Sequence, residues 1–171
     1  MAFKFILLRH AHAGTKEKFK KKFSLPDSKR PISARGRREM KDVLKAIMRL
    51  VPNIDLILSS DLMRAEQTAH LLNKKYRKAK YQEILELRPN SHPRELIKKL
   101  KAVAQDECVA VVGHEPHLSR LLSFILTGAD QTDFDIKKGG FAIVEFYDQF
   151  KITQARLMCL VQPPRLKQLK K

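Results

Sequence analysis

Arginine and histidine stand side by side directly after a short apolar run near the start of the chain. The run, Phe3 to Leu8, is too short for a typical helix and rich in strand-forming residues, which predicts a buried strand. In an open α/β sheet, ligands bind beyond the carboxyl ends of the parallel strands, where Arg9 and His10 would lie. Arginine offers a planar fork for phosphate oxygens, and histidine offers a nucleophile or proton carrier near neutral pH. Two residues that merely end a strand and face solvent would show the same pattern.

Two further polar residues follow predicted strands in a similar way. Residues 108–113 form a near-continuous apolar run, typical of a central parallel strand, and His114 comes directly after it. Arg64 lies in the first turn of a predicted helix that follows the strand Ile54–Leu58. A cation there opposes the helix dipole, so it favours an anion bound beside the free N–H groups over a purely stabilising role. The alternative is an arginine exposed to water.

The elements that must position these residues alternate between strand and helix. We expect strands at residues 3–8, 54–58, 81–87 and 108–113. Start signals predict intervening helices that begin at Ser33, after the Ser59-Ser60-Asp61 cluster, at Pro93 and at Pro116. This order predicts an α/β fold: a three-layer α/β/α sandwich around a mainly parallel sheet.

Two segments lie outside this alternation. Phe141–Tyr147 and Ile152–Val161 are predicted to form an antiparallel edge hairpin that turns at Asp148-Gln149-Phe150. Thr15–Arg30 shows no clean period and contains many lysines, so we interpret it as a basic loop beside Arg9 and His10.

The formal net charge of +17 is the main compositional feature. It predicts attraction to anionic partners, such as phosphoproteins, polyphosphate, nucleic acid or an acidic membrane surface, or simply a solvated lysine-rich surface. No apolar run approaches the roughly 20 residues of a membrane span, and no signal pattern opens the chain, so we expect a cytoplasmic protein. The length fits one domain, 1–162, followed by a basic C-terminal tail, 163–171. Cys108 and Cys159 lie in apolar runs and are expected to be buried free thiols.

Three segments together resemble the histidine phosphatase superfamily, which is also called phosphoglycerate-mutase-like. Their order and spacing match across most of the chain. The short length and the Arg-His-Ala-x-Ala form are most similar to the SixA-type phosphohistidine phosphatases. The usual superfamily signature has glycine after the histidine, and here the small residue alanine stands there. The segments are Leu8-Arg9-His10-Ala11-His12-Ala13, Ser59-Ser60-Asp61-Leu62-Met63-Arg64-Ala65-Glu66-Gln67-Thr68-Ala69 and Val112-Gly113-His114-Glu115-Pro116.

The resemblance implies that strand 3–8 lies beside strand 108–112, and it also implies roles for four residues. His10 would be the nucleophile that takes up the phosphoryl group, while Arg9, Arg64 and His114 would bind the phosphoryl oxygens. These roles agree with the chemistry expected of the residues themselves, because phosphoryl transfer depends chiefly on placement and positive charge. No metal ion or other cofactor is required.

The general acid is the weakest part of the match. Larger members of the family use a glutamate near the end of the third strand, and Glu86 is the nearest match here. Glu83 and Glu115 are competitors, and a surface carboxylate without a catalytic role is the common alternative. SixA-type members also lack the usual acid, and imidazole is a good leaving group for a phosphohistidine substrate.

These observations predict a metal-independent phosphatase that acts through a covalent phosphohistidine on His10, with phosphohistidine on a protein as its expected substrate. A phosphatase or mutase for small phosphorylated metabolites is one alternative, although the short segment 87–93 leaves little room for an enclosing lid. A non-catalytic module that binds phosphate or nucleic acid is another. The intact set of two arginines and two histidines argues against it, and no nucleic-acid recognition motif is present. The basic surface favours acidic partners and no membrane association is expected.

Overall fold

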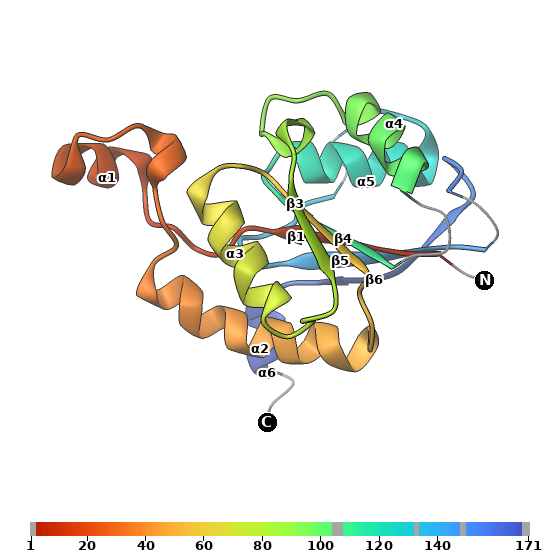
Figure 1. The fold of residues 1–171 in the computed structure, drawn as a ribbon, viewed down its shortest axis with the longest axis horizontal. Coiled ribbons are helices and arrows are strands. Elements are labelled where there is room, and N and C mark those ends of the chain that lie inside the picture. Colours follow the sequence, from red (N-terminus) through yellow and green to blue (C-terminus); the bar gives the residue numbers. More distant parts are fainter. Residues whose placement is uncertain (1–2, 104–107, 132–133, 148–149, 169–171) are drawn as a thin grey trace.

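A six-stranded mixed sheet runs through the middle of the protein, with helices on both faces (Figure 1). The computed structural model describes residues 3–103, 108–131, 134–147 and 150–168. The strands, in chain order, are β1 (Phe3–Arg9), β2 (Leu56–Ser59), β3 (Lys80–Glu83), β4 (Val109–Gly113), β5 (Phe141–Phe146) and β6 (Ala155–Val161). The helices are α1 (Lys16–Phe23), α2 (Ala34–Leu50), α3 (Met63–Asn73), α4 (Pro93–Val103), α5 (His117–Thr127) and α6 (Pro163–Gln168), with short 3₁₀ turns η1 (Asp27–Lys29) and η2 (Leu85–Leu87).

The strand order β3-β2-β4-β1-β5-β6 confirms the predicted sheet. β1 pairs in parallel with β4, as expected, and β2 is parallel to both β4 and β3. The predicted hairpin is the antiparallel pair β5–β6, which continues the sheet beyond β1. Residues 148–149 of its expected turn lie outside the described residues. Because β1, β2 and β4 are parallel neighbours, their carboxyl ends meet at one edge of the sheet.

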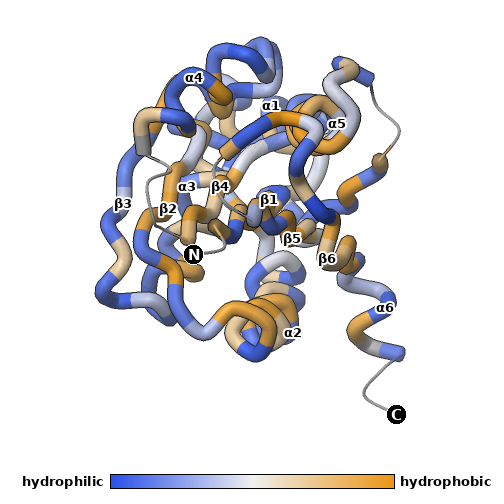
Figure 2. The backbone as a smooth tube through the Cα atoms, turned by 90° about the vertical axis from the view of Figure 1, so that its right-hand side faces the viewer, coloured by the Kyte–Doolittle hydropathy of each residue, from blue (hydrophilic) through white to orange (hydrophobic). Residues whose placement is uncertain are grey.

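Alternate residues of β1 fill two separate cores. Phe5 and Leu7 belong to the core on the side of α4 and α5, while Ile6 and Leu8 belong to the core on the side of α2 and α3. A strand buried on both faces needs an unbroken apolar run, which is why residues 3–8 carry so little polarity. Figure 2 shows hydrophobic residues along the central strands and a more hydrophilic β3 at the edge.

Local signals place several helix ends as the sequence predicts. Ser33 caps α2, and its hydroxyl accepts the Gly36 N–H. Gly128 ends α5 in the left-handed conformation that glycine adopts readily. α3 begins at Met63 without a side-chain cap, because Ser60 in the expected capping cluster accepts the Leu62 N–H instead. Within the described part of the chain, no helix has the length and apolar character that crossing a bilayer requires.

The segment predicted to be a basic loop contains helix α1 and turn η1, so that prediction is wrong. The Thr15 hydroxyl accepts the Lys18 N–H and caps the helix. Phe19 and Phe23 lie one turn apart, with ring centroids separated by 5.1 Å. The third strand is also shorter than predicted. Its neighbour β2 ends at Ser59, and the last backbone hydrogen bond between the two segments runs from the Ile84 N–H to the Ser59 carbonyl.

The C-terminal segment differs from the frayed tail expected from the sequence. Pro163–Gln168 form α6, and Leu166 packs against the core on the α2 side. Pro163, the first residue of the helix, is buried as well. Cys108 and Cys159 are free thiols, as predicted, but both are partly exposed rather than buried.

Candidate active site

His10 lies at the carboxyl end of β1 and is 5% exposed. Its Nδ1 is 2.7 Å from the carbonyl oxygen of Ala11, which can only accept, so Nδ1 carries the proton and Nε2 has the free lone pair. Burial lowers the pKa of His10 well below its ordinary value, and the positive charges of Arg64 and Arg9 lower it further. His10 is therefore an uncharged imidazole with a nucleophilic nitrogen at neutral pH.

His114 follows β4 and faces His10, with a distance of 5.0 Å between the ring centroids. Its Nε2 is 3.0 Å from the Ser60 hydroxyl, which itself accepts the Leu62 N–H. When the hydroxyl donates to Nε2, the ring proton of His114 resides on Nδ1. That nitrogen is buried and has no hydrogen-bond partner within the described residues. Burial and the charge of Arg64 lower the pKa of His114 to about 3, so this histidine is a neutral donor.

Arg64 and Arg9 supply positive charge to the same place. Arg64 is 5% exposed in the first turn of α3, and its Nε has no partner in the part of the chain that the structure describes. Arg9 donates from Nη1 to the Ile136 carbonyl at 2.8 Å, and its Nε is likewise buried without a partner among these residues. Burial lowers the pKa of both guanidinium groups, although both stay charged at neutral pH. Unpaired buried N–H donors on cations suit an anionic ligand.

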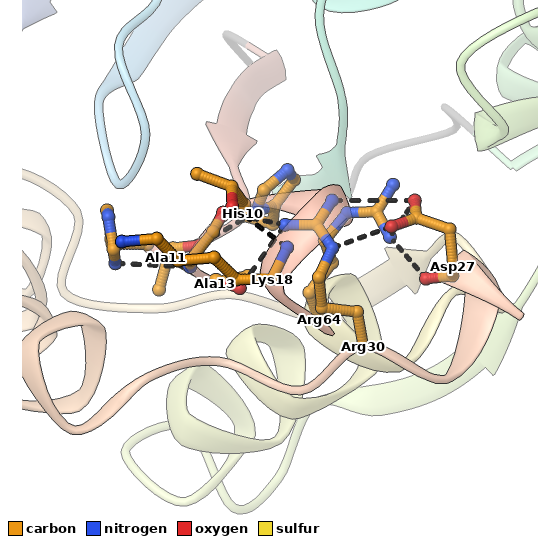
Figure 3. Close-up of polar contacts among 10 residues, drawn as sticks. His10, Ala11, Ala13, Lys18, Asp27, Arg30 and Arg64 are labelled. Atoms are coloured by element: carbon orange, nitrogen blue, oxygen red, sulfur yellow. Dashed lines mark hydrogen bonds and ion pairs between the residues drawn. The ribbon is translucent and has the colours of Figure 1, made fainter. Parts of the chain in front are cut away.

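Asp27 and Arg30 also belong to this arrangement, and sequence reasoning missed both. Figure 3 shows Arg30 and Arg64 meeting at Asp27. The Arg30 Nε donates to the Asp27 carboxylate at 2.7 Å, and Arg64 Nη1 lies 3.3 Å from its other oxygen. Arg30 also donates to the carbonyls of Ala13 and Gly14 at 3.2 and 2.9 Å. The available signal was an aspartate in a segment otherwise dominated by lysine.

Thr68 and Gly36 hold the loop that follows His10. The Thr68 hydroxyl accepts the Ala11 N–H at 3.0 Å and donates to the Arg64 carbonyl at 2.7 Å, which joins the loop to α3. On the other side, a Cβ added at Gly36 would lie 2.3 Å from the His12 carbonyl oxygen. Only glycine allows α2 to approach the loop this closely. The position of His10 thus depends on contacts from both α2 and α3.

Glu86, the predicted general acid, forms no hydrogen bond or ion pair with this cluster in the described part of the chain. Glu86 lies on η2 and forms an ion pair with Lys99 of α4 at 3.3 Å. The charge of Glu86 is not among the main causes of the lowered pKa of His10. Glu83 accepts from the Tyr81 hydroxyl at an exposed edge. Glu115 accepts from Ser119 and has a raised pKa because of burial, which the charge of Arg9 opposes.

A wide groove opens beside this cluster. Its volume is about 970 Å³, and its lining includes Arg64, Asp27, Lys16, Arg88 and His92. Arg64 thus stands between the buried imidazoles and an open, polar surface. A phosphoryl group can approach Arg64 from this side without the molecule that carries it being enclosed.

The fold and the site define a class: an α/β protein that presents a neutral histidine among arginines at the carboxyl edge of its parallel strands. The family model described as "Histidine phosphatase superfamily (branch 1)" matches residues 5–88. The chain belongs to this superfamily. No curated protein matches the sequence.

Solved structures show the same fold at low sequence identity. The protein histidine phosphatase SixA complexed with tungstate has a TM-score of 0.81 and 20% identity, over 96% of this chain and 99% of that one. A candidate phosphohistidine phosphatase SixA from Agrobacterium tumefaciens gives 0.76 and 20%, over 94% and 98%. A mutant phosphoserine phosphatase from Entamoeba histolytica, in complex with phosphoserine, gives 0.67 and 14%, over 94% and 98%. Proteins with different stated substrates therefore share this architecture.

Proposed function

We propose that this protein removes phosphate from phosphohistidine on proteins, through a covalent phosphohistidine intermediate on His10 and without a metal ion. The observation that carries the proposal is the Nδ1–H bond from His10 to the Ala11 carbonyl at 2.7 Å, which leaves Nε2 unprotonated beside the two arginines. A buried nucleophile of this kind needs no proton removed before it attacks.

In the first step, the lone pair of His10 Nε2 attacks the phosphorus atom of the substrate. A P–Nε2 bond forms while the P–N bond of the substrate breaks, and the electron pair of that bond stays on the departing imidazole. If the second nitrogen of that imidazole is protonated, the ring departs as a neutral molecule. Arg9, Arg64 and the Nδ1–H of His114 are available to the phosphoryl oxygens as their charge develops.

In the second step, a water molecule attacks the phosphorus atom of the phosphorylated His10. The new O–P bond replaces the P–Nε2 bond, whose electron pair returns to the nitrogen. The proton lost by the water passes to the phosphate product or to solvent. His10 is restored as a neutral ring, in keeping with its lowered pKa. The charges of the arginines fill the role that a metal ion has in other phosphatases.

The substrate class is argued from the groove and the leaving group. A groove of about 970 Å³ that opens at Arg64 can admit a residue on a protein surface. No glutamate is held against His10 by a contact in the described residues, so a serine alkoxide would have to leave without an assured proton donor. Phosphohistidine avoids this difficulty. The structural likeness to SixA proteins agrees with this choice.

Small phosphorylated metabolites remain the second candidate. A mycobacterial glucosyl-3-phosphoglycerate phosphatase also shares the fold, with a TM-score of 0.67 and 17% identity. The groove here is open, so it offers such a molecule few contacts beyond its phosphoryl group.

The proposed intermediate can be trapped directly. Brief incubation with a ³²P-labelled phosphoramidate, followed by denaturation, should leave label on the wild type that is stable in base and labile in acid. His10→Ala should fold normally and carry no label. Label that persists on the variant would place the nucleophile elsewhere. Full activity in the presence of a chelator is expected, and loss of activity restored by one divalent cation would overturn the metal-free step.

The substrate class is tested by the ratio of kcat/KM on one carrier protein phosphorylated on histidine and a matched one phosphorylated on serine. A ratio well above one, with poor activity on a panel of sugar phosphates, supports the proposal. Efficient hydrolysis of one sugar phosphate, with phosphohistidine untouched, would assign the protein to the metabolite phosphatases.

A further inference from the structure

Residues 15–30, which contain α1 and η1, form an arm that extends away from the sheet (Figure 1). None of the α1 residues is buried. Phe23 and Leu25 are about half exposed, at 51% and 49%. These two large apolar side chains are two positions apart in the chain, so the arm exposes them within one short segment. The lysines of the arm are Lys16, Lys18, Lys20, Lys21, Lys22 and Lys29.

The arm is fastened to the active site rather than free. Asp27 at its base pairs with Arg30 at 2.7 Å and with Arg64 at 3.3 Å. Arg30 donates hydrogen bonds to the carbonyls of Ala13 and Gly14, a few residues after His10. Any surface on the arm therefore has a defined position relative to His10.

Two hollows connect the arm to the site. The first has a volume of about 280 Å³. Its apolar lining is Phe19, Leu25 and Pro26, and its polar lining is Lys16, Lys20, Ser24 and Asp27. The second is the groove of about 970 Å³ that reaches Arg64, and it is also lined by Lys16 and Asp27. The two hollows together, which we call the track, share these two residues, and the larger hollow reaches Arg64. A cavity of about 150 Å³ can hold benzene, so the first hollow has room for one apolar side chain.

We infer that this track docks the acidic polypeptide segment around the phosphorylated histidine of a protein substrate, with one apolar side chain of that segment in the hollow formed by Phe19 and Leu25. The inference rests on the proposed function and names what the substrate must carry besides its phosphate. The lysines of the arm complement acidic side chains along the track. A small metabolite reaches only the Arg64 end. A polypeptide is long enough to contact both hollows and can place its phosphate beside the buried Arg64. A flat membrane surface cannot enter both hollows.

The test uses acidic peptides that carry one phosphohistidine and either leucine or serine at successive distances from it. On the wild type, leucine at one distance should lower KM about tenfold relative to serine, with kcat unchanged. Leu25→Asp should raise KM for the leucine peptide about tenfold and remove the difference between the two peptides. Hydrolysis of a small aryl phosphate should not change.

Leu50→Asp is a matched control, because Leu50 is also 49% exposed and lies at the end of α2. It introduces the same charge and should leave both peptides unaffected. Likewise, Lys16→Glu should raise KM for the acidic peptides more than Lys45→Glu, which makes the same charge change on α2. Equal effects of the arm variants and their controls would overturn the inference.

Two further measurements separate the possible failures. Fluorescence anisotropy with a labelled peptide bearing a non-hydrolysable phosphohistidine analogue reports docking without turnover. Leu25→Asp should weaken this binding about tenfold even if the proposed reaction were wrong, and unchanged binding would refute the docking. Sedimentation with phosphatidylserine–phosphatidylcholine vesicles tests the other partner class. Vesicle binding that is lost in Leu25→Asp, with peptide binding intact, would make the arm a membrane surface and overturn the inference.

Discussion

Replacement of Asp27 by asparagine separates the two roles of the arginines at the site. In the absence of phosphate, the Asp27 carboxylate is the counter-charge of Arg30 and Arg64, whose side chains are 11% and 7% exposed. A phosphoryl group would compete with this carboxylate for Arg64, or at least be repelled by it. Asp27→Asn should therefore lower the free energy of unfolding of the phosphate-free protein and raise its affinity for phosphate.

The magnitude follows from the contacts. Hydrogen bonds to charged groups contribute about 1.5–3 kcal/mol each. Asp27 is 25% exposed and asparagine keeps one acceptor, so we expect a total loss of about 2 kcal/mol in the free energy of unfolding. For a chain of this size, that loss lowers Tm by about 4–8 °C. Because Arg64 is then left without a counter-charge, phosphate should bind about tenfold more tightly, which corresponds to about 1.4 kcal/mol.

The two effects are linked and can be measured together. At saturating phosphate, the stability difference between wild type and Asp27→Asn should shrink by the same ~1.4 kcal/mol. Urea denaturation of both proteins with and without phosphate gives four free energies of unfolding. Calorimetric titration gives the phosphate affinity of each protein. Asp61→Asn is the control, since Asp61 is 27% exposed and pairs with Arg88 at the surface. It should cost at most about 1 kcal/mol and leave phosphate affinity unchanged.

The competing role for Asp27 is to orient Arg64 for phosphate. In that case the variant would bind phosphate more weakly than the wild type, and added phosphate would widen the stability difference. Such a result would refute the competition between the Asp27 carboxylate and phosphate. The pH dependence provides a second check. Hydrogen bonding to Arg30 and the charge of Arg64 lower the pKa of Asp27 below 3.8. The contribution of Asp27 to the free energy of unfolding should therefore be complete above pH 3.8 and be lost as pH falls through the lowered pKa.

Arg64→Ala should reduce kcat/KM by a factor equivalent to about 2–4 kcal/mol, and a near-wild-type rate on an aryl phosphate would contradict a role for Arg64 in binding the phosphoryl group. Gly36→Ala should lower stability by about 1–3 kcal/mol and also reduce kcat, because the added Cβ meets the His12 carbonyl, whereas helix propensity alone would favour alanine. His117 is fully buried with a pKa of about 4, so the unfolded chain binds a proton between about pH 6.5 and pH 4 that the native chain does not. Stability should therefore fall as pH drops through this range, by up to about 1.4 kcal/mol per pH unit for this residue, and urea titrations of wild type and His117→Leu should show a shallower fall in the variant. Glu86→Gln should leave phosphohistidine hydrolysis unchanged if Glu86 serves only Lys99, and a selective loss on phosphoserine would identify it as the general acid.

Most of the sheet could be predicted because its signals are local. A strand buried on both faces requires a short apolar run, and Phe3–Arg9 and Val109–Gly113 have one. Ser33 and Gly128 mark helix ends through interactions with residues at most four positions away. Once these strands are parallel neighbours, the residues that follow them must meet at one edge. The sequence by itself therefore determined that Arg9, His10 and His114 lie together.

What only the tertiary structure decided are contacts between segments far apart in the chain. α1 has eight residues, too few for a stable isolated helix, and its place depends on the pairing of Asp27 with an arginine 37 positions away. With 35 lysines and arginines in the sequence, the residue types alone do not show which of them Asp27 selects. The same holds for Glu86, which pairs with Lys99 on a separate helix. Ion pairs and close approaches of this kind depend on distances in space, and those distances exist only after the sheet and its helices have packed.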